Sequence, residues 1–159
     1  MTSLKKNKIL IIGAGNMGIS FIKALINNNI TSKNIFVLER NPSKQLSKIK
    51  KDKKINVATN ISFYKENQKP DIVLLAVKPN QFESLFDNKL KSFLNSSIII
   101  SIIAGKKLSI LKKITGNKEK TVRAMTNTPI SVGMGISVVF FDKKTNSSLK
   151  NKSKSFLKL

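Results

Sequence analysis

Three regularly spaced glycines are the first residues whose types and positions suggest chemistry. Gly13, Gly15 and Gly18 form the pattern G-x-G-x-x-G directly after an apolar run at 8–12. In such a loop the first glycine permits a tight turn, the second lets the backbone approach a pyrophosphate, and the third lets a helix pack closely on a strand. Unpaired N–H groups at the start of that helix attract phosphate oxygens. The loop therefore predicts a dinucleotide site.

The residues after the next apolar run bear on which dinucleotide fits. Glu39 stands about 20 positions beyond the loop, where an acidic side chain accepts from a ribose 2′-hydroxyl and favours NAD. Arg40, Asn41 and Lys44 follow it, and their donors suit a 2′-phosphate, which favours NADP. We expect NADPH because three donors follow the one acid, and NADH remains the alternative.

Short β-branched runs alternate with longer amphipathic stretches along the chain. This alternation predicts parallel strands joined by right-handed crossovers. We expect strands at 8–12, 34–39, 55–58, 71–77, 97–103, 121–125 and 136–141, and helices at 16–28, 42–51, 79–94, 108–114 and 147–159. The predicted fold class is α/β, a Rossmann-type doubly wound, mainly parallel sheet with helices on both faces.

The composition excludes several classes of chemistry. The 159 residues contain no Cys and no His. This excludes disulfides, thiolate nucleophiles, Ser-His-Asp catalysis and zinc sites built on Cys, and we expect no metal. Catalysis would come from a bound cofactor, from the backbone, or from Lys, Asp, Glu, Ser and Thr side chains.

The formal charge of +22, from 30 Lys+Arg and 8 Asp+Glu, points at first to a polyanion partner. All basic residues except Arg40 and Arg123 are Lys, whereas nucleic-acid readers favour Arg for bidentate contacts. Lys, Asn and Ile are abundant together and share A/T-rich codons, which explains the mixture by codon bias. We therefore favour a solvated lysine surface over a nucleic-acid site. A basic module that binds a dinucleotide or polyanion without catalysis stays as the alternative.

No segment suggests a membrane span or an export signal. The most apolar run, at 98–104, is seven residues long, whereas a membrane helix needs about 20. We expect a cytoplasmic protein.

Three further motifs, with GAGNMG at 13–18, resemble the pyrroline-5-carboxylate reductase family. They are AVKP at 76–79, SIIAG at 101–105, and MTNTP at 125–129 followed by VGMG at 132–135. The resemblance implies an oxidoreductase of proline biosynthesis that reduces 1-pyrroline-5-carboxylate to L-proline with a hydride from NAD(P)H. It also implies a dinucleotide-binding domain at 1–145, with 146–159 beginning a helix toward a helical dimerisation domain that this sequence lacks. We therefore expect a truncated member of a family whose full-length chains homo-oligomerise.

The resemblance and the spacing together define the expected site. The predicted cofactor-binding residues are Ile12, Gly13, Ala14, Gly15, Asn16, Met17, Gly18, Glu39, Arg40, Asn41, Asn60, Ala76, Val77, Lys78, Pro79, Ile102, Ile103 and Ala104. The main substrate residues would lie in the missing domain, and the catalytic candidates here are Lys78, Asn127 and Thr128. Lys78 either positions the ribose or the substrate carboxylate or is a solvated lysine. Asn127 and Thr128 either face the substrate or cap a strand.

Overall fold

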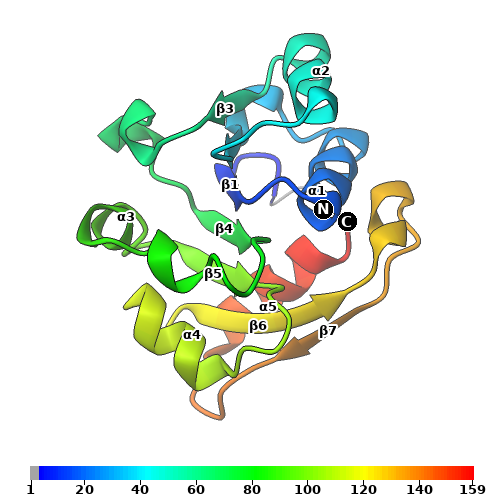
Figure 1. Ribbon diagram of the computed structural model, residues 1–159. Helices are drawn as coiled ribbons and strands as arrows, with labels where there is room; N and C mark the ends of the chain where they lie inside the picture. Colours follow the sequence, from blue (N-terminus) through cyan, green and yellow to red (C-terminus); the bar gives the residue numbers. More distant parts are fainter. Residues whose placement is uncertain (1–3) are drawn as a thin grey trace.

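A seven-stranded sheet runs through the centre of the molecule in the computed structural model, which describes residues 4–159 (Figure 1). Residues 1–3 of the predicted domain lie outside the described part. The strands are β1 (Ile9–Ile12), β2 (Ile35–Leu38), β3 (Asn56–Ala58), β4 (Ile72–Leu75), β5 (Ile98–Ser101), β6 (Thr121–Thr126) and β7 (Ser137–Phe140). Their order is β3-β2-β1-β4-β5-β6-β7, and every pairing is parallel except that of β6 with β7. The predicted doubly wound, mainly parallel sheet is confirmed.

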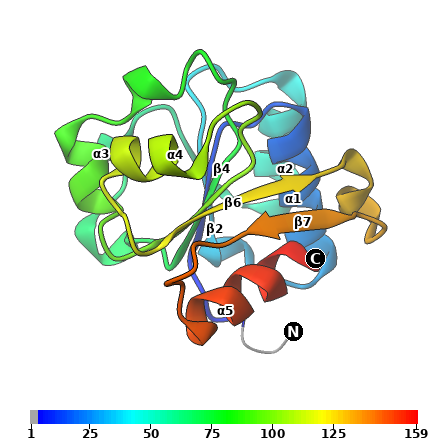
Figure 2. The ribbon, with the colours of Figure 1, turned by 90° about the horizontal axis from the view of Figure 1, so that it is seen from below.

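Helices cover both faces of the sheet, as Figure 2 shows in the view from below. The α-helices are α1 (Asn16–Asn27), α2 (Lys44–Lys53), α3 (Asn88–Phe93), α4 (Leu108–Thr115) and α5 (Ser147–Leu157), and the 3-10 helices are η1 (Ser32–Asn34), η2 (Ile61–Phe63), η3 (Glu66–Gln68), η4 (Glu83–Leu85) and η5 (Thr128–Val132). One apolar core lies between the sheet and α1, α2 and α5, and a second lies between the sheet and η4, α3 and α4.

The central strands serve both cores because successive side chains of a strand point to opposite faces. In β1, Ile9 and Ile11 belong to the first core, whereas Leu10 and Ile12 belong to the second. All four are essentially inaccessible to solvent. A strand buried on both faces needs an uninterrupted apolar run, which is why the sequence alone indicates its position.

The predicted helix at 79–94 is wrong. The segment forms the short η4, then a break at Phe86 (φ −90°, ψ 77°), and only then α3. Asp87 begins α3 as its N-cap, since its Oδ1 accepts a 2.7 Å hydrogen bond from the N–H of Leu90. The break lets Phe82 and Phe86 both lie buried, with their rings edge to face at 5.4 Å. The other predicted elements are present, with ends shifted by at most two residues.

The last helix, α5, packs against the sheet and contributes to the first apolar core. Phe156 on α5 is fully buried, and its ring stacks on that of Phe21 in α1 at 5.7 Å. Leu149, Leu157 and Leu159 are buried in the same core. Residues 147–159 are therefore packed as part of the dinucleotide-type fold, and a helical domain beyond them stays a prediction. None of the described helices is long and apolar enough to cross a membrane.

Replacing Tyr64 with Phe should destabilise the fold by about 1–2 kcal/mol, because the hydroxyl completes the backbone pairing of β2. The hydroxyl donates to the carbonyl of Val37 (2.7 Å) and accepts from its N–H (3.2 Å). Burial raises the pKa of Tyr64 well above its usual range, so the folded state favours the neutral phenol. Stability should therefore fall as pH rises above the ordinary tyrosine pKa of about 10, and more in the natural chain than in the variant. Urea titrations of both chains at neutral and alkaline pH measure this, and equal pH slopes would contradict it.

Candidate functional site

The candidate site lies at the carboxyl ends of β1, β2, β3 and β4. The strand order reverses at β1, because β2 and β3 lie on one side of it in the sheet and β4 and the later strands lie on the other. Open α/β sheets bind ligands outside the carboxyl ends of the strands where the strand order reverses in this way. The loop of three glycines follows β1 at this position.

Two of the three glycines are required by the chain itself. Gly13 has φ +92°, and a Cβ there would come within 2.8 Å of the carbonyl group of Ala76. A Cβ on Gly18 would collide with the carbonyl oxygen of Gly13. The loop is therefore folded tightly onto the end of β4 on one side and onto its own helix on the other.

Gly15 differs from the other two glycines, because a side chain at this position would not collide with the fold. It has an ordinary backbone conformation (φ −69°, ψ −167°), and nothing lies within 4 Å of a Cβ placed on it. Gly15 is also the N-cap of α1, and no side chain caps the helix. The first N–H groups of a helix have no partner within it and form the positive end of its dipole. Open space thus faces an uncapped helix start, an arrangement that suits a phosphate group.

Glu39 ties the glycine loop to the end of β2. Its Oε2 accepts a 2.8 Å hydrogen bond from the N–H of Ala14, and its Oε1 accepts a 3.1 Å bond from the N–H of Asn41. The sequence predicted Glu39 as an acceptor for a ribose hydroxyl. In the structure each carboxylate oxygen of Glu39 already accepts a hydrogen bond from a backbone N–H. Glu39 therefore positions the loop, whether or not it also contacts a ligand.

Two adjoining cavities share Leu38, Arg40 and Leu85, and the smaller of them reaches the loop at Gly13. The smaller, of about 110 Å³, is lined by Ile12, Gly13, Leu38, Glu39, Arg40, Asn41, Val77, Gln81 and Leu85. The larger, of about 220 Å³, is lined by Leu38, Arg40, Thr59, Asn60, Ile61, Ser84, Leu85, Asp87 and Leu90. The walls of both cavities combine leucine and isoleucine side chains with polar groups, and the exposed guanidinium of Arg40 lies between them, a mixture that fits the base, ribose and 2′-substituent of a nucleotide.

The AVKP turn contributes one wall of the smaller cavity. The N–H of Ala76 donates to the carbonyl of Ile12 (2.8 Å), which holds the turn against the glycine loop. Val77 lines the cavity, whereas Lys78 and Pro79 are exposed beside it. Asn60 lines the larger cavity, and its Oδ1 accepts from the N–H of Ser62 at 2.9 Å to begin η2.

The turn after β5 stands apart from both cavities. Its backbone is anchored to β4 by the N–H of Ile102, which donates to the carbonyl of Leu75 (3.1 Å). Ile103 is buried in the second core and Ala104 is exposed. A contact between these three residues and a cofactor stays a prediction. An ion pair joins this edge to η4, because Lys106 Nζ lies 2.8 Å from Glu83 Oε1, and the hydrogen bond from that ammonium lowers the pKa of Glu83.

The two polar residues after β6 take different positions. Asn127 Oδ1 accepts a 2.8 Å hydrogen bond from the N–H of Ile136, which closes the turn between β6 and β7. This is the capping role that the sequence left open for Asn127. Thr128 is exposed at the start of η5. η5 packs on α1, where Asn27 Nδ2 donates to the carbonyl of Ser131 at 3.1 Å.

Several cavity residues were missed by the sequence analysis. They are Leu38, Thr59, Ile61, Gln81, Ser84, Leu85, Asp87 and Leu90. Five of these come from 81–90, which the apolar spacing predicted as one continuous helix. Asp87 followed by two polar residues before Leu90 was the available signal for an N-cap inside that segment.

The strand order and the glycine loop define a Rossmann domain, and comparison with known proteins assigns the family. The family described as "NADP oxidoreductase coenzyme F420-dependent" matches residues 8–105, and the chain belongs to it. A pyrroline-5-carboxylate reductase from Aquifex aeolicus is 32% identical over 132 residues, which cover 83% of this chain and 47% of that protein.

Solved structures agree with this assignment. A pyrroline-5-carboxylate reductase from Coxiella burnetii has a TM-score of 0.79 and 29% identity, covering 96% of this chain and 56% of its own. The Plasmodium falciparum pyrroline carboxylate reductase, solved with NADP bound, has a TM-score of 0.77 and 29% identity, covering 97% and 55%. The chain therefore spans about half the length of the relatives it matches.

Proposed function

We propose that this chain is the cofactor-binding part of an enzyme that reduces 1-pyrroline-5-carboxylate to L-proline. The observation that carries the proposal is the likeness to pyrroline-5-carboxylate reductases over nearly the whole chain. The substrate pocket would be completed by a helical domain, through which we also expect the enzyme to form homo-oligomers. We expect it to act in the cytoplasm.

The proposed cofactor is a nicotinamide dinucleotide, and the described residues fit it. The N–H groups at the start of α1 would bind the diphosphate over Gly15, where the chain leaves open space. Leu38 and Leu85 would contact the adenosine in the adjoining cavities, with Arg40 at their shared edge. When bound, the nicotinamide would supply the hydride that reduces the carbon of the C=N bond. Lys78, exposed beside the turn after β4, would hold the ribose or the substrate carboxylate.

The chain's own residues would chiefly orient the cofactor. Glu39 holds the glycine loop through the N–H of Ala14, and the N–H of Asn41 fixes the carboxylate in turn, so the diphosphate site would be formed in advance. A binding site that is already ordered in the free protein loses little conformational entropy when the ligand binds. This suits a chain without His or Cys, in which binding and orientation rather than proton transfer would be the main contribution.

NADPH is the form that we propose, and Arg40→Ala tests it. Both oxygens of Glu39 face the backbone, whereas Arg40 and Asn41 are exposed beside the smaller cavity. Loss of a guanidinium–phosphate contact should weaken NADPH binding about 10–100-fold and leave NADH binding within about twofold. Calorimetric titration of both cofactors measures this. Lys48→Ala, on the exposed surface of α2, removes an equal charge as a control. Equal losses for NADH and NADPH would contradict the proposal.

The reductase activity itself is tested by joining this chain to the half of a relative that it does not span. The chain alone should bind NADPH at micromolar concentrations and form no proline. A fusion to the C-terminal half of the Aquifex aeolicus reductase should form proline from 1-pyrroline-5-carboxylate. A fusion that is folded and binds NADPH but forms no proline would refute the substrate, whereas a chain that binds neither NADPH nor NADH would refute the dinucleotide site.

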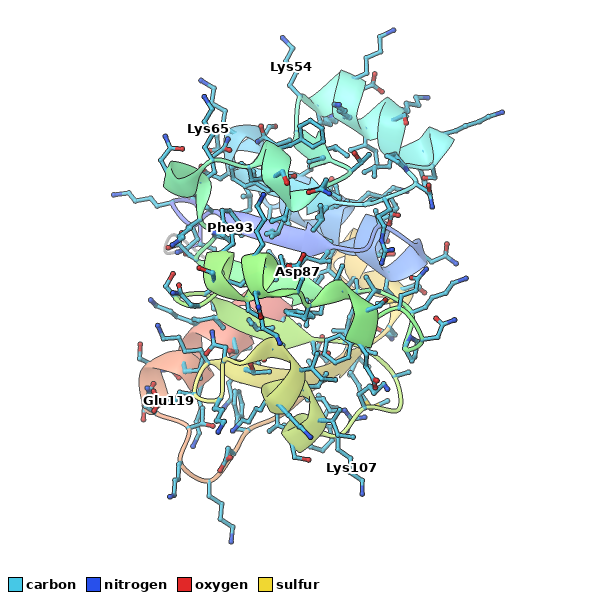
Figure 3. The ribbon with its side chains drawn as sticks, turned by 60° about the vertical axis from the view of Figure 1, so that its left-hand side comes forward. Lys54, Lys65, Asp87, Phe93, Lys107 and Glu119 are labelled. Carbon is cyan, nitrogen blue, oxygen red and sulfur yellow. The ribbon has the colours of Figure 1, made fainter. Side chains whose placement is uncertain are left out.

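The charge is the remaining argument for a different function. Figure 3 shows Lys54 and Lys65 at one end of the molecule and Lys107 at the other, all extending outward. Lysines spread in this way suit a solvated surface more than one polyanion site. The prediction that nucleic acid is no partner is tested by DNA binding at about 150 mM salt, where retention with a steep log-linear salt dependence would favour the basic module.

A further inference from the structure

The larger of the two cavities is where the base of a bound dinucleotide would lie, an inference that rests on the proposed function. The smaller cavity reaches the glycine loop at Gly13, whereas the larger is lined by the end of β2 and by segments that follow β3 and β4. A diphosphate over Gly15 would therefore be followed by its ribose in the smaller cavity and by its base in the larger one. Arg40 lines both cavities and lies where they adjoin. The side chains of the larger cavity thus determine which base is bound.

The apolar side chains of the larger cavity suit the faces of a purine ring. They are Leu38, Ile61, Leu85 and Leu90. Leu38, Ile61 and Leu90 are buried in the second core and Leu85 packs against it, so packing fixes their positions. Apolar contacts hold a flat base without distinguishing one base from another, and specificity comes from a few placed polar groups. Selection of a base must therefore come from polar groups on the same walls.

Two polar side chains of this cavity are already engaged by the chain itself. Asn60 Oδ1 accepts hydrogen bonds from the N–H of Ser62 (2.9 Å) and from the hydroxyl of Ser62 (2.8 Å). The hydroxyl of Ser84 donates to the carbonyl of Gln81 at 3.2 Å. The oxygen of Asn60 and the hydroxyl hydrogen of Ser84 are thus used by the local turns in which these residues lie.

Asp87 differs, because only one of its two carboxylate oxygens is used by the fold (Figure 3). Oδ1 accepts a 2.7 Å hydrogen bond from the N–H of Leu90 and caps α3. Within residues 4–159, no donor contacts the other oxygen, Oδ2. Asp87 is also the one acidic side chain among the described residues that line the larger cavity. An ionised carboxylate only accepts hydrogen bonds, so Asp87 offers a base one acceptor and no donor.

We propose that Asp87 is a specificity-determining residue, whose Oδ2 accepts a hydrogen bond from the exocyclic amine of adenine. Hypoxanthine carries a carbonyl oxygen in place of that amine, and a carboxylate repels it. Guanine also carries a carbonyl oxygen there, and its two adjacent donors pair best with both oxygens of a carboxylate, of which the helix cap leaves one. A site that is built to bind an N–H group rejects analogues that lack it. The cavity therefore selects the adenine form of the dinucleotide.

Deamino-NADPH, in which hypoxanthine replaces adenine, tests this assignment against NADPH. The natural chain should bind deamino-NADPH about 10-fold more weakly in calorimetric titrations, because a hydrogen bond to a charged group is lost. Asp87→Asn keeps the helix cap, since asparagine caps a helix as well as aspartate does. The variant also replaces the free oxygen with an N–H donor, which suits the carbonyl oxygen of hypoxanthine. It should therefore reverse the preference and bind deamino-NADPH at least about threefold more tightly than NADPH.

The ratio of the two affinities separates recognition of the base from effects of charge and stability. Removing a carboxylate near an anionic cofactor strengthens the binding of both forms alike, so it leaves the ratio unchanged. Asp52→Asn, on the exposed surface of α2, removes an equal charge and should keep the ratio of the natural chain. Asp87→Ser retains a helix cap but has a shorter side chain with no second oxygen, so it should bring the ratio close to one.

The outcomes distinguish this assignment from the proposed function. A natural chain that binds NADPH and deamino-NADPH equally would overturn the assignment and leave the dinucleotide site standing. An Asp87→Asn variant that unfolds at the temperature of the natural chain and keeps its ratio would do the same. A chain that binds neither NADPH nor NADH would refute the proposed function, and the role of Asp87 with it.

Discussion

Gly15→Asp should weaken NADPH binding about 100-fold or more, while the free energy of unfolding rises slightly. A Cβ at Gly15 has open space around it, and Gly15 already has the extended backbone of an N-cap. An aspartate at the N-cap accepts from the first N–H groups of the helix and complements its dipole, which stabilises by a few tenths to about 1 kcal/mol. The same carboxylate fills the space proposed for the diphosphate and repels it. Calorimetric titration with NADPH and thermal unfolding measure the two effects separately.

Two other variants sharpen this result. Gly15→Asn adds a similar volume without charge, so it should lose less affinity than Gly15→Asp, and the difference measures the repulsion. Gly13→Ala should instead destabilise the fold, because φ is +92° and the Cβ would press on Ala76. If Gly15→Asp binds NADPH like the natural chain, the phosphates are not at the start of α1.

The parts of the fold that could be predicted are those that a single local rule determines. β1 and β4 are buried on both faces, so nothing but apolar residues fits them, and their runs stand out in the sequence. The glycine loop could be predicted because each of its conformational requirements is met by a single glycine at a fixed position. Gly13 and Gly18 satisfy the chain's own geometry, and Gly15 leaves space that the chain does not use.

The parts that could not be predicted depend on competition between neighbouring groups. The apolar spacing at 79–94 fits one helix, but Asp87 caps a new helix start and lets Phe82 and Phe86 both reach the core. The walls of both cavities around Leu85 follow from that break. The role of Glu39 was also hidden, because a carboxylate after β2 can hold either a ribose or the glycine loop, and only the folded chain shows two backbone N–H groups on it.

The position of α5 bears on where the domain ends. The sequence predicted 146–159 as the start of a helix that leaves the dinucleotide-binding domain. The structure instead buries Leu149, Phe156 and Leu157 against the sheet and α1. A helix can both complete this core and lead to a further domain, so the two statements are compatible. What remains to be measured is how much of the stability of residues 4–145 depends on α5.

Phe156→Ala should therefore destabilise the chain by about 3–5 kcal/mol, the loss expected for a buried phenylalanine. The ring is fully buried and stacks on Phe21, so its removal leaves a cavity between α1 and α5 and deprives Phe21 of its partner. Urea unfolding followed by circular dichroism measures the change. Since small domains hold only about 5–15 kcal/mol in total, Phe156→Leu provides a milder variant that should lose about 1–1.5 kcal/mol and remain folded.

Asn151→Ala, on the exposed side of the same helix, serves as the control and should stay within about 0.5 kcal/mol of the natural chain. If residues 147–159 merely led away from the domain, Phe156→Ala would be as harmless as this control. A large loss in Phe156→Ala with an unchanged control would make α5 an integral part of the dinucleotide-type fold. The proposed cofactor site lies at the carboxyl ends of strands in that sheet, so it would then depend on α5 as well.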